Sequence, residues 1–325
     1  MERIREFELL KILLENTDGQ HSITKSEILT LMQKAGFSLS DDTLGKYIKQ
    51  FELYGYNVEV TMGRNACYRL TKRTFLKEEI KLIVDAINAS NFIEKQTAIE
   101  FKEKLSHFIS KYEVDELRRT VQSITVAKTE NKKILNNVER IQNAINRNKC
   151  ISFDYLTYDE NMKLVNKSDR TYTLSPFTAI WAYDRYYLYG YDTVEKNGKY
   201  KERCYRVDKL NNIRILQQDR VGYDQFESFN ANKFVSRRIG MFTGEEEKIT
   251  LKIEKNKFSL LVDQFGKYVQ IVDTLDDNHL VVSFNAVSSE PFLGWLIGLS
   301  GVEVLAPQSV REKMKRLLEE NAKKY

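Results

Sequence analysis

The sequence predicts an α+β protein with several domains. Its 325 residues exceed the usual size of one domain, which is about 150 residues. Apolar residues make up 42% of the chain and charged residues 30%, which is typical of a globular protein. The apolar spacing changes from a helical to a strand period near residue 150, and both periods occur after residue 247. These changes predict four segments: 1–75, 76–139, 140–225 and 226–325.

The N-terminal segment predicts three helices followed by a hairpin. Apolar residues at helical spacing indicate a helix over 3–15. A second helix begins after Thr24, which has the spacing of a capping box with Glu27. A third helix is expected over 41–55, and the alternation over 57–70 indicates two strands joined by a turn. This order is that of a winged helix-turn-helix, in which the third helix reads DNA.

The third helix and the hairpin tip carry side chains that could contact DNA. A helix fits the major groove, and a hairpin can reach phosphates or the adjacent minor groove. Thr, Lys and Arg donate hydrogen bonds to phosphate oxygens, whereas Gln and Asn can read a base edge. The predicted DNA-binding residues are Thr43, Lys46, Lys49, Gln50, Arg64 and Asn65. The alternative is that these side chains are only solvated polar positions.

Residues 76–139 predict helices whose main role is packing. Ile80, Ile83 and Ile87 fall on one helical face, and a further amphipathic pattern covers 134–145. The polar residues of these helices form no cluster. We therefore expect connecting arms or a dimer surface.

The third segment predicts a small, strongly bent sheet or barrel of the SH3-like, Sm-like or OB-like kind. From Cys150 the chain alternates in short runs rich in Tyr, Val and Thr, with turn residues at 184–185 and 197–198. The segment has 15 basic and 11 acidic residues, and its net charge of +4 is most of the +5 of the whole chain. A basic surplus beside many tyrosines indicates an anionic or nucleic-acid partner, although solvated surface lysines would also explain it.

The last segment predicts strands and helices in the order β-α-β-β-α-β, followed by a closing helix. That order is typical of a ferredoxin-like split β-α-β unit. The closing helix has Pro307 near its first turn. Trp295 lies at helical spacing with apolar neighbours, which favours the core or a dimer interface over a ligand site.

Several motifs resemble the WYL domain of bacterial transcription regulators and the WCX extension that follows it. The triplet Tyr-Tyr-Leu at 186–188 stands where that family has Trp-Tyr-Leu. The other matching positions are Phe153 and Tyr155 in ISFDY, Ser175 and Pro176 in TLSPF, and Arg203, Tyr205, Arg206, Asp208 and Lys209 in ERCYRVDKL. Lys209 replaces the usual Arg. The stretches 263–266 and 292–299 resemble the WCX extension, so the resemblance covers nearly the whole chain.

The resemblance implies a homodimeric DNA-binding regulator in the bacterial cytoplasm. Its winged helix would bind double-stranded DNA, and its WYL barrel would sense a ligand, often thought to be a nucleic acid or nucleotide. Two residues depart from relatives, whose third helix often reads Arg-Thr-Val-x-Arg-Asp-Ile. Asp42 replaces a common Arg and would repel phosphate, and Gly45 weakens the helix by about 1 kcal/mol relative to Ala.

Arginines and tyrosines of the WYL-like segment could bind such a ligand. Guanidinium groups match phosphate geometry, and aromatic faces stack on bases. Strand alternation predicts that Arg203 and Arg206 face opposite sides of one strand. The predicted ligand-binding residues are Ser152, Tyr155, Arg170, Tyr187, Arg203 and Arg206, with Arg206 preferred over Arg203. The alternative is that Arg206 forms a structural ion pair with Asp208 or Asp154.

The sequence gives little support to an enzyme. Its three cysteines are far apart, its three histidines are scattered, and it has no Gly-rich phosphate loop or nucleophile elbow. We therefore predict no catalytic residue, metal or cofactor. The apolar runs are too short for a bilayer, and no signal peptide is evident. A different function remains open, namely an accessory module that binds single-stranded DNA or RNA and modulates a partner effector, for example in phage defence.

Overall fold

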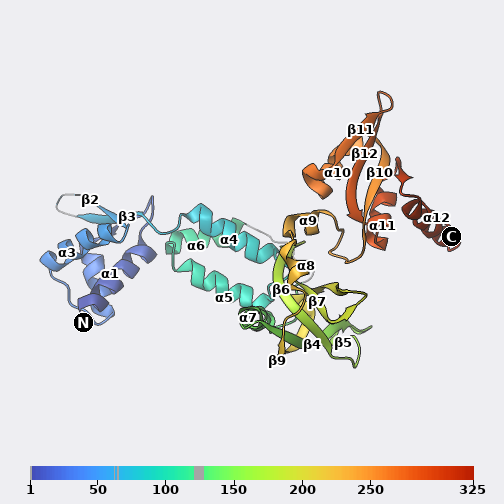
Figure 1. The fold of residues 1–325 in the computed structure, drawn as a ribbon. Coiled ribbons are helices and arrows are strands. Elements are labelled where there is room, and N and C mark those ends of the chain that lie inside the picture. The colour runs from blue at the N-terminus through green and yellow to red at the C-terminus, as the bar shows by residue number, and fades with distance from the viewer. Residues whose placement is uncertain (1, 62, 64–65, 121–127) are drawn as a thin grey trace. The chain divides into compact units, whose positions relative to one another are not determined.

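The computed structural model describes residues 2–61, 63, 66–120 and 128–325. The chain divides into two compact units, Met1–Glu130 and Asn131–Tyr325 (Figure 1). The first unit is mostly helical, and the second holds two separate sheets with helices. The prediction of a mixed α and β chain with several domains is confirmed at this level.

The first unit begins with three helices and a small sheet (Figure 1). Its elements are α1 (Glu2–Asn16), β1 (Ile23–Thr24), α2 (Lys25–Lys34), α3 (Asp41–Leu53), β2 (Asn57–Thr61) and β3 (Cys67–Lys72). The strands are antiparallel in the order β1-β3-β2. The helices and hairpin follow the order that the sequence predicts, and the two-residue strand β1 is an addition. The expected turn residues 62, 64 and 65 lie outside the described part of the chain.

Local sequence signals explain where these helices begin. The Thr24 side chain accepts from the Glu27 backbone, and the Glu27 carboxylate accepts from the Thr24 backbone, which confirms the predicted capping box. Ser40 caps α3 by accepting from the Thr43 backbone N–H. The buried faces of the three helices meet in one apolar core, which includes Leu9, Leu13, Ile28, Leu44, Tyr47 and Phe51.

The same unit continues with α4 (Lys77–Ala89), α5 (Lys95–Ser106) and α6 (Lys111–Thr120). A buried carboxylate connects the start of α6 to the loop after α1. The Ser110 hydroxyl donates to Asp18 over 2.5 Å, and His21 contacts the same carboxylate over 2.8 Å. Burial raises the pKa of Asp18, but hydrogen bonds from Ser110, Gln20 and His21 outweigh it and lower that pKa to about 2.

The second unit begins with a helix and a bent sheet. The elements are α7 (Ile134–Asn146), β4 (Lys149–Tyr158), β5 (Leu164–Asn166), β6 (Tyr172–Ala182), β7 (Arg185–Lys196), β8 (Lys199–Arg206), the 3₁₀ turn η1 (Val207–Lys209) and β9 (Leu210–Asp219). The sheet order is β5-β4-β6-β7-β8, and β9 also pairs with β4. Asn137 of α7 donates to the Leu210 carbonyl, which fastens the helix to the start of β9.

Two tight turns and one close backbone contact shape this sheet. Tyr183 and Asp184 have positive φ and make the β6–β7 turn, one residue earlier than the sequence predicts. Asn197 and Gly198 make the β7–β8 turn as predicted. At Gly190, an added Cβ would lie 2.2 Å from the Ser175 carbonyl oxygen, so only glycine permits this approach of β6 and β7.

Two short helices follow the bent sheet, and the rest of the second unit contains a four-stranded sheet with three helices. The elements are α8 (Tyr223–Glu227), α9 (Ala231–Ser236), β10 (Glu246–Glu254), η2 (Lys255–Lys257), α10 (Phe258–Phe265), η3 (Gly266–Tyr268), β11 (Gln270–Thr274), β12 (His279–Val287), α11 (Glu290–Leu299), β13 (Val302–Ala306) and α12 (Gln308–Ala322). The antiparallel strand order is β11-β12-β10-β13. The elements from β10 to β13 follow the predicted β-α-β-β-α-β order. Trp295 packs against the apolar core, edge-on to Phe265.

Candidate functional site

The register of β8 on β7 decides which side each arginine faces. Tyr187 is opposite Arg206, and Gly190 is opposite Arg203, without an irregularity between them. Because side chains alternate along a strand, Arg203 and Arg206 point to opposite faces of the sheet. This arrangement agrees with the prediction from their spacing. The two arginines therefore belong to two different groups of side chains.

The first group surrounds the buried carboxylate of Asp208. Arg206 donates to it twice, from Nε over 3.1 Å and from Nη2 over 2.6 Å. Arg185 donates to the same carboxylate over 3.2 Å. The Asp208 side chain is only 3% exposed, whereas that of Arg206 is 33% exposed. Arg206 thus makes the structural ion pair that the sequence left open as an alternative, while a third of its side chain remains exposed.

The charge of this first group is positive. Lys209 follows Asp208 directly, and its Nζ lies 3.8 Å from the centre of the Tyr158 ring. Burial and the neighbouring Arg206 lower the pKa of Lys209. Arg185 and Arg206 pair with Asp208, whereas Lys209 lies against Tyr158, so three cationic side chains surround a single carboxylate. A cluster with this excess favours the approach of an anion.

Tyrosines near this group are held in their neutral form. Tyr187 is buried, and burial raises its pKa. Burial also raises the pKa of Tyr155 to about 12, although a backbone hydrogen bond from Arg206 acts in the opposite direction. Neither phenol ionises near neutral pH, so these rings contribute packing and neutral hydroxyl groups. Neither has the pKa expected of a general base.

The second group is a cluster of aromatic rings on the Arg203 side. Phe153, Tyr155, Tyr172 and Tyr205 contact one another with ring centroids 5.1 to 6.1 Å apart. The Arg170 guanidinium lies 5.8 Å from the Tyr172 ring, and Lys167 lies 6.0 Å from the Tyr155 ring. Phe153 is only 1% exposed, so we call the other five residues, Tyr155, Tyr172, Tyr205, Arg170 and Lys167, the aromatic–basic surface. Proteins that bind single-stranded nucleic acid usually combine cationic side chains with aromatic rings on which bases stack.

Arg203 lies beside this surface and already has a carboxylate partner. Its Nε and Nη2 donate to the two oxygens of Asp192 over 2.7 and 2.6 Å. This ion pair raises the pKa of Arg203 and fixes the guanidinium plane. An incoming phosphate would have to share or displace Asp192.

The six predicted ligand-binding residues do not form one pocket. Arg206 and Tyr187 belong to the Asp208 group, whereas Arg170 and Arg203 lie on the other side. Tyr155 touches both groups through its ring and its hydroxyl. Ser152 is buried in β4, opposite Thr173 of β6 and Arg214 of β9.

Sequence reasoning missed five residues of these groups, although strand alternation could have found three of them. Arg185 is two residues before Tyr187, Tyr172 is two after Arg170, and Tyr205 is two after Arg203. Lys167 lies two residues before Asp169, in the connection between β5 and β6. This connection has no regular period, so no simple sequence signal marks Lys167. Lys209 was noted only as the replacement of an Arg in the motif.

On α3, the predicted DNA-contacting side chains are unequally placed. Lys46 and Lys49 are exposed, whereas Thr43 is half-buried and its hydroxyl bonds to the cap residue Ser40. The Oε1 atom of Gln50 is buried, so its acceptor is turned away from solvent. Arg64 and Asn65 lie outside the described residues.

Within the described parts of the chain, no three His, Cys, Asp or Glu side chains gather as a metal site requires. None of the helices in those parts is both long enough and apolar enough to cross a bilayer.

Two family models match the second unit. The WYL domain model matches residues 136–215, and the WCX domain model matches residues 245–322. The chain therefore carries a WYL domain followed by a WCX domain, as the motifs predict. The aromatic–basic surface and the Asp208 group both belong to the WYL domain.

Comparison with whole proteins adds little beyond these domains. No protein of curated function matches the chain. Among solved structures, proteasome accessory factor B/C (PafBC) of Arthrobacter aurescens is similar at 14% identity and a TM-score of 0.26, over 98% of this chain and 47% of that chain. A CRISPR Cas-related protein is similar at 14% identity and a TM-score of 0.38, over 91% of this chain and 77% of that chain. The chain thus spans about half the length of PafBC, and likenesses this distant say nothing of what it binds.

Proposed function

We propose that this chain is a ligand-responsive transcription regulator that binds double-stranded DNA as a homodimer. In this proposal the first 75 residues form a winged helix, and α3 enters the major groove. The WYL domain binds a nucleic acid or a nucleotide-like anion. The observation that carries the proposal is the aromatic–basic surface, where Arg170 and Lys167 lie against tyrosine rings beside a second basic group.

Arg170 offers the cleanest test of ligand binding. It is exposed, and its side chain makes no ion pair with any residue that the structure describes, so Arg170→Ala should leave the fold intact. We expect this variant to bind labelled single-stranded oligonucleotides several-fold more weakly, with a salt dependence reduced by about one charge. Fluorescence anisotropy at several salt concentrations measures both. Arg316→Ala, an exposed arginine on α12, is the matched control.

Equal binding by the Arg170 and Arg316 variants would reject the WYL surface as the ligand site. The probes should include single-stranded DNA, single-stranded RNA and mononucleotides, because all three carry phosphate and a base. A preference among them would identify the ligand class.

The two exposed lysines of α3 test duplex binding. Replacing Lys46 and Lys49 together with Ala removes two phosphate donors, and we expect duplex affinity and its salt dependence to fall together. The double variant of Lys323 and Lys324 near the C-terminus is the control for lost positive charge. If both double variants bind duplex DNA equally, α3 is not the reading helix.

A second candidate function has one observation in its favour. The first turn of α3 carries the carboxylates of Asp41 and Asp42, and the Gln50 acceptor is buried, so this helix is poorly equipped for DNA. The chain would then be an accessory module that binds single-stranded nucleic acid and modulates a partner effector. Preference for single strands over every duplex, lost on Arg170→Ala and unaffected by the α3 changes, would favour this alternative.

A further inference from the structure

The two arginines of β8 that pair with carboxylates differ in how far their ion pairs are open to solvent. In the pair of Arg206 and Asp208 the carboxylate side chain is only 3% exposed, whereas Arg203 and Asp192 are 33% and 28% exposed. Opening a buried pair leaves an unpaired charge in the interior, but an exposed pair opens readily because water solvates both ions. Of these two pairs, only that of Arg203 can therefore exchange its carboxylate for another anion.

The Asp192 carboxylate occupies the donors that a phosphate group would use. Nε and Nη2 of Arg203 donate to its two oxygens over 2.7 and 2.6 Å. Phosphate oxygens bind a guanidinium edge in the same paired geometry. Nη1 of Arg203 makes no hydrogen bond to any residue that the structure describes, so a phosphate can contact this atom first. The carboxylate and a phosphate are thus alternative partners of one guanidinium.

The pairing of β7 with β8 brings Asp192 to the aromatic–basic surface. Gly190 is opposite Arg203, and Asp192 follows it by two residues, so both charged side chains project from one face. Regular pairing of the strands is interrupted after Tyr191, and such an interruption can redirect a side chain. Tyr205 is on the same face of β8. Burial raises the pKa of Tyr205, Arg203 lowers it and Asp192 raises it, so both charges act on this ring.

The two cations of the aromatic–basic surface have no such partner. Arg170 and Lys167 lie near tyrosine rings and make no ion pair with any residue that the structure describes. A ligand can contact these two side chains without displacing a carboxylate, but it binds the paired donors of Arg203 only by replacing Asp192. A bare phosphate separates one ion pair to form another and gains little. A nucleotide also stacks its base on an aromatic ring, which favours the exchange.

We propose that Asp192 is a built-in competitor for the phosphate of the ligand. In the free WYL domain its carboxylate holds Arg203. In the complex a phosphate takes its place, and Asp192 turns to solvent. The carboxylate weakens the binding of every ligand that uses Arg203, so anions without a stacking base bind poorly there. This proposal rests on the ligand binding of the proposed function and concerns the regulation of that same site.

Asp192→Asn removes the competing charge and nearly keeps the shape of the side chain. We expect this variant to bind a labelled single-stranded oligonucleotide about fivefold more tightly than the wild type, which is the upper range for an exposed ion pair. The slope of log affinity against log salt concentration should steepen by about 0.7, because no freed carboxylate takes up a counterion when the ligand binds. Fluorescence anisotropy at several salt concentrations measures both quantities.

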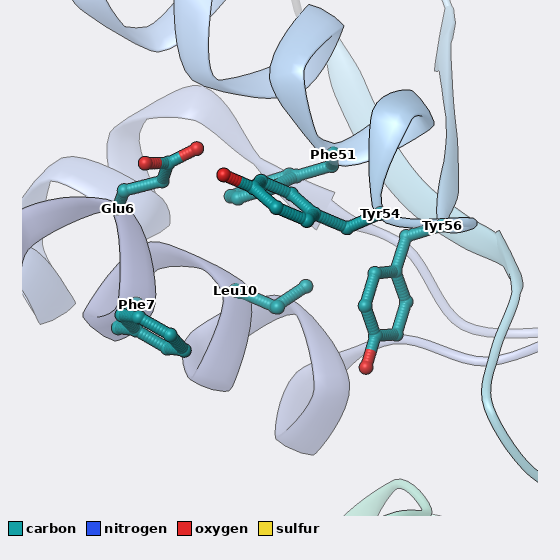
Figure 2. Close-up of a pocket in the computed structure, with 6 residues that line it drawn as sticks. All are labelled: Glu6, Phe7, Leu10, Phe51, Tyr54 and Tyr56. Atoms are coloured by element: carbon teal, nitrogen blue, oxygen red, sulfur yellow. The ribbon is translucent and has the colours of Figure 1, made fainter. Parts of the chain in front are cut away.

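Three further variants separate competition from a general change of charge. Asp192→Glu keeps a carboxylate near Arg203, and we expect its affinity and salt slope to stay close to those of the wild type. Glu195→Gln removes one negative charge from an exposed position of the same strand. Glu6→Gln removes one from the other unit, where Glu6 lines a hollow between α1 and α3 (Figure 2). Both should change the affinity by less than about twofold, since exposed charges are screened by salt.

Three results would overturn the proposal. Weaker binding by Asp192→Asn would show that the carboxylate positions Arg203 for the ligand, and unchanged binding would show that the ligand does not reach Arg203. A gain no larger than that of Glu195→Gln would reflect net charge alone. Arg170→Ala, measured in the same series, separates this proposal from the proposed function. If Arg170→Ala weakens binding but Asp192→Asn does not strengthen it, only this inference fails; if neither changes binding, the WYL surface fails as the ligand site too.

Discussion

Asp208 shows how one buried side chain can organise a basic surface. Its carboxylate holds Arg206 through two hydrogen bonds and Arg185 through a third. Without it, two guanidinium groups would repel each other at the end of β8 and the start of β7. The ion pairs hold the two guanidinium groups in place and would position them for the proposed ligand, so the structural and functional interpretations of Arg206 need not exclude each other.

This double role leads to a prediction for Arg206. Arg206→Ala would leave the buried carboxylate with Arg185 alone, and we expect the WYL domain to lose about 2 kcal/mol of unfolding free energy. Arg206→Lys should lose less because it keeps the charge, but it should still lose some stability, since a lysine cannot donate the paired hydrogen bonds. Denaturation can be followed by Trp181 fluorescence in a Trp295→Phe background, which leaves one tryptophan in the chain. Equal stability of all three proteins would show that Asp208 does not depend on Arg206.

Asp18 predicts a pH dependence of the first unit. Its pKa is about 2 in the folded chain and 3.8 in the unfolded one, so the folded state is favoured when this group is ionised. The stabilisation is complete above about pH 4 and is lost as pH falls towards 2. We expect Asp18→Asn to be less stable by about 2 kcal/mol at neutral pH, and this difference to shrink below pH 4 and disappear as pH falls through 2. Urea titrations followed by far-ultraviolet circular dichroism measure it; a difference independent of pH would contradict the assignment.

At the scale of elements, α3 contains a glycine that weakens it as a helix. Gly45 lies in the middle of this helix, is exposed, and an added Cβ would meet open space. We expect Gly45→Ala to raise the unfolding free energy by about 0.5–1 kcal/mol, because alanine loses less conformational entropy in a helix. Thermal unfolding of the two proteins checks this value. Lower stability of the alanine variant would show that Gly45 serves a contact not seen in the isolated chain.

The same elements show which structural features could be predicted from the sequence and which could not. Helix periodicity and the Thr24–Glu27 capping pattern predicted the first helices, and strand alternation predicted the opposite faces of Arg203 and Arg206. The ion pair of Arg203 could not be predicted, because Asp192 comes from the neighbouring strand and meets it only in the observed register.

At the scale of the whole molecule, the proposed regulator must couple its ligand to DNA. We expect a saturating single-stranded oligonucleotide to change duplex affinity by about five- to 150-fold, the usual range for allosteric coupling. By thermodynamic linkage, saturating duplex must change oligonucleotide affinity by the same factor. Anisotropy titrations with each nucleic acid labelled in turn measure both factors, and Arg170→Ala should abolish the effect. Independent binding of the two would leave a DNA-binding protein without a sensor.

The close contact at Gly190 limits how this sheet can be altered. Residue 190 follows the Tyr-Tyr-Leu triplet by two positions, and even a methyl group there would overlap the Ser175 carbonyl. If β7 is randomised to change what the domain binds, position 190 should therefore stay glycine. Any other amino acid there would clash with the Ser175 carbonyl and disrupt the sheet. Exposed positions of the same strand, such as Val194, are where diversity can be introduced.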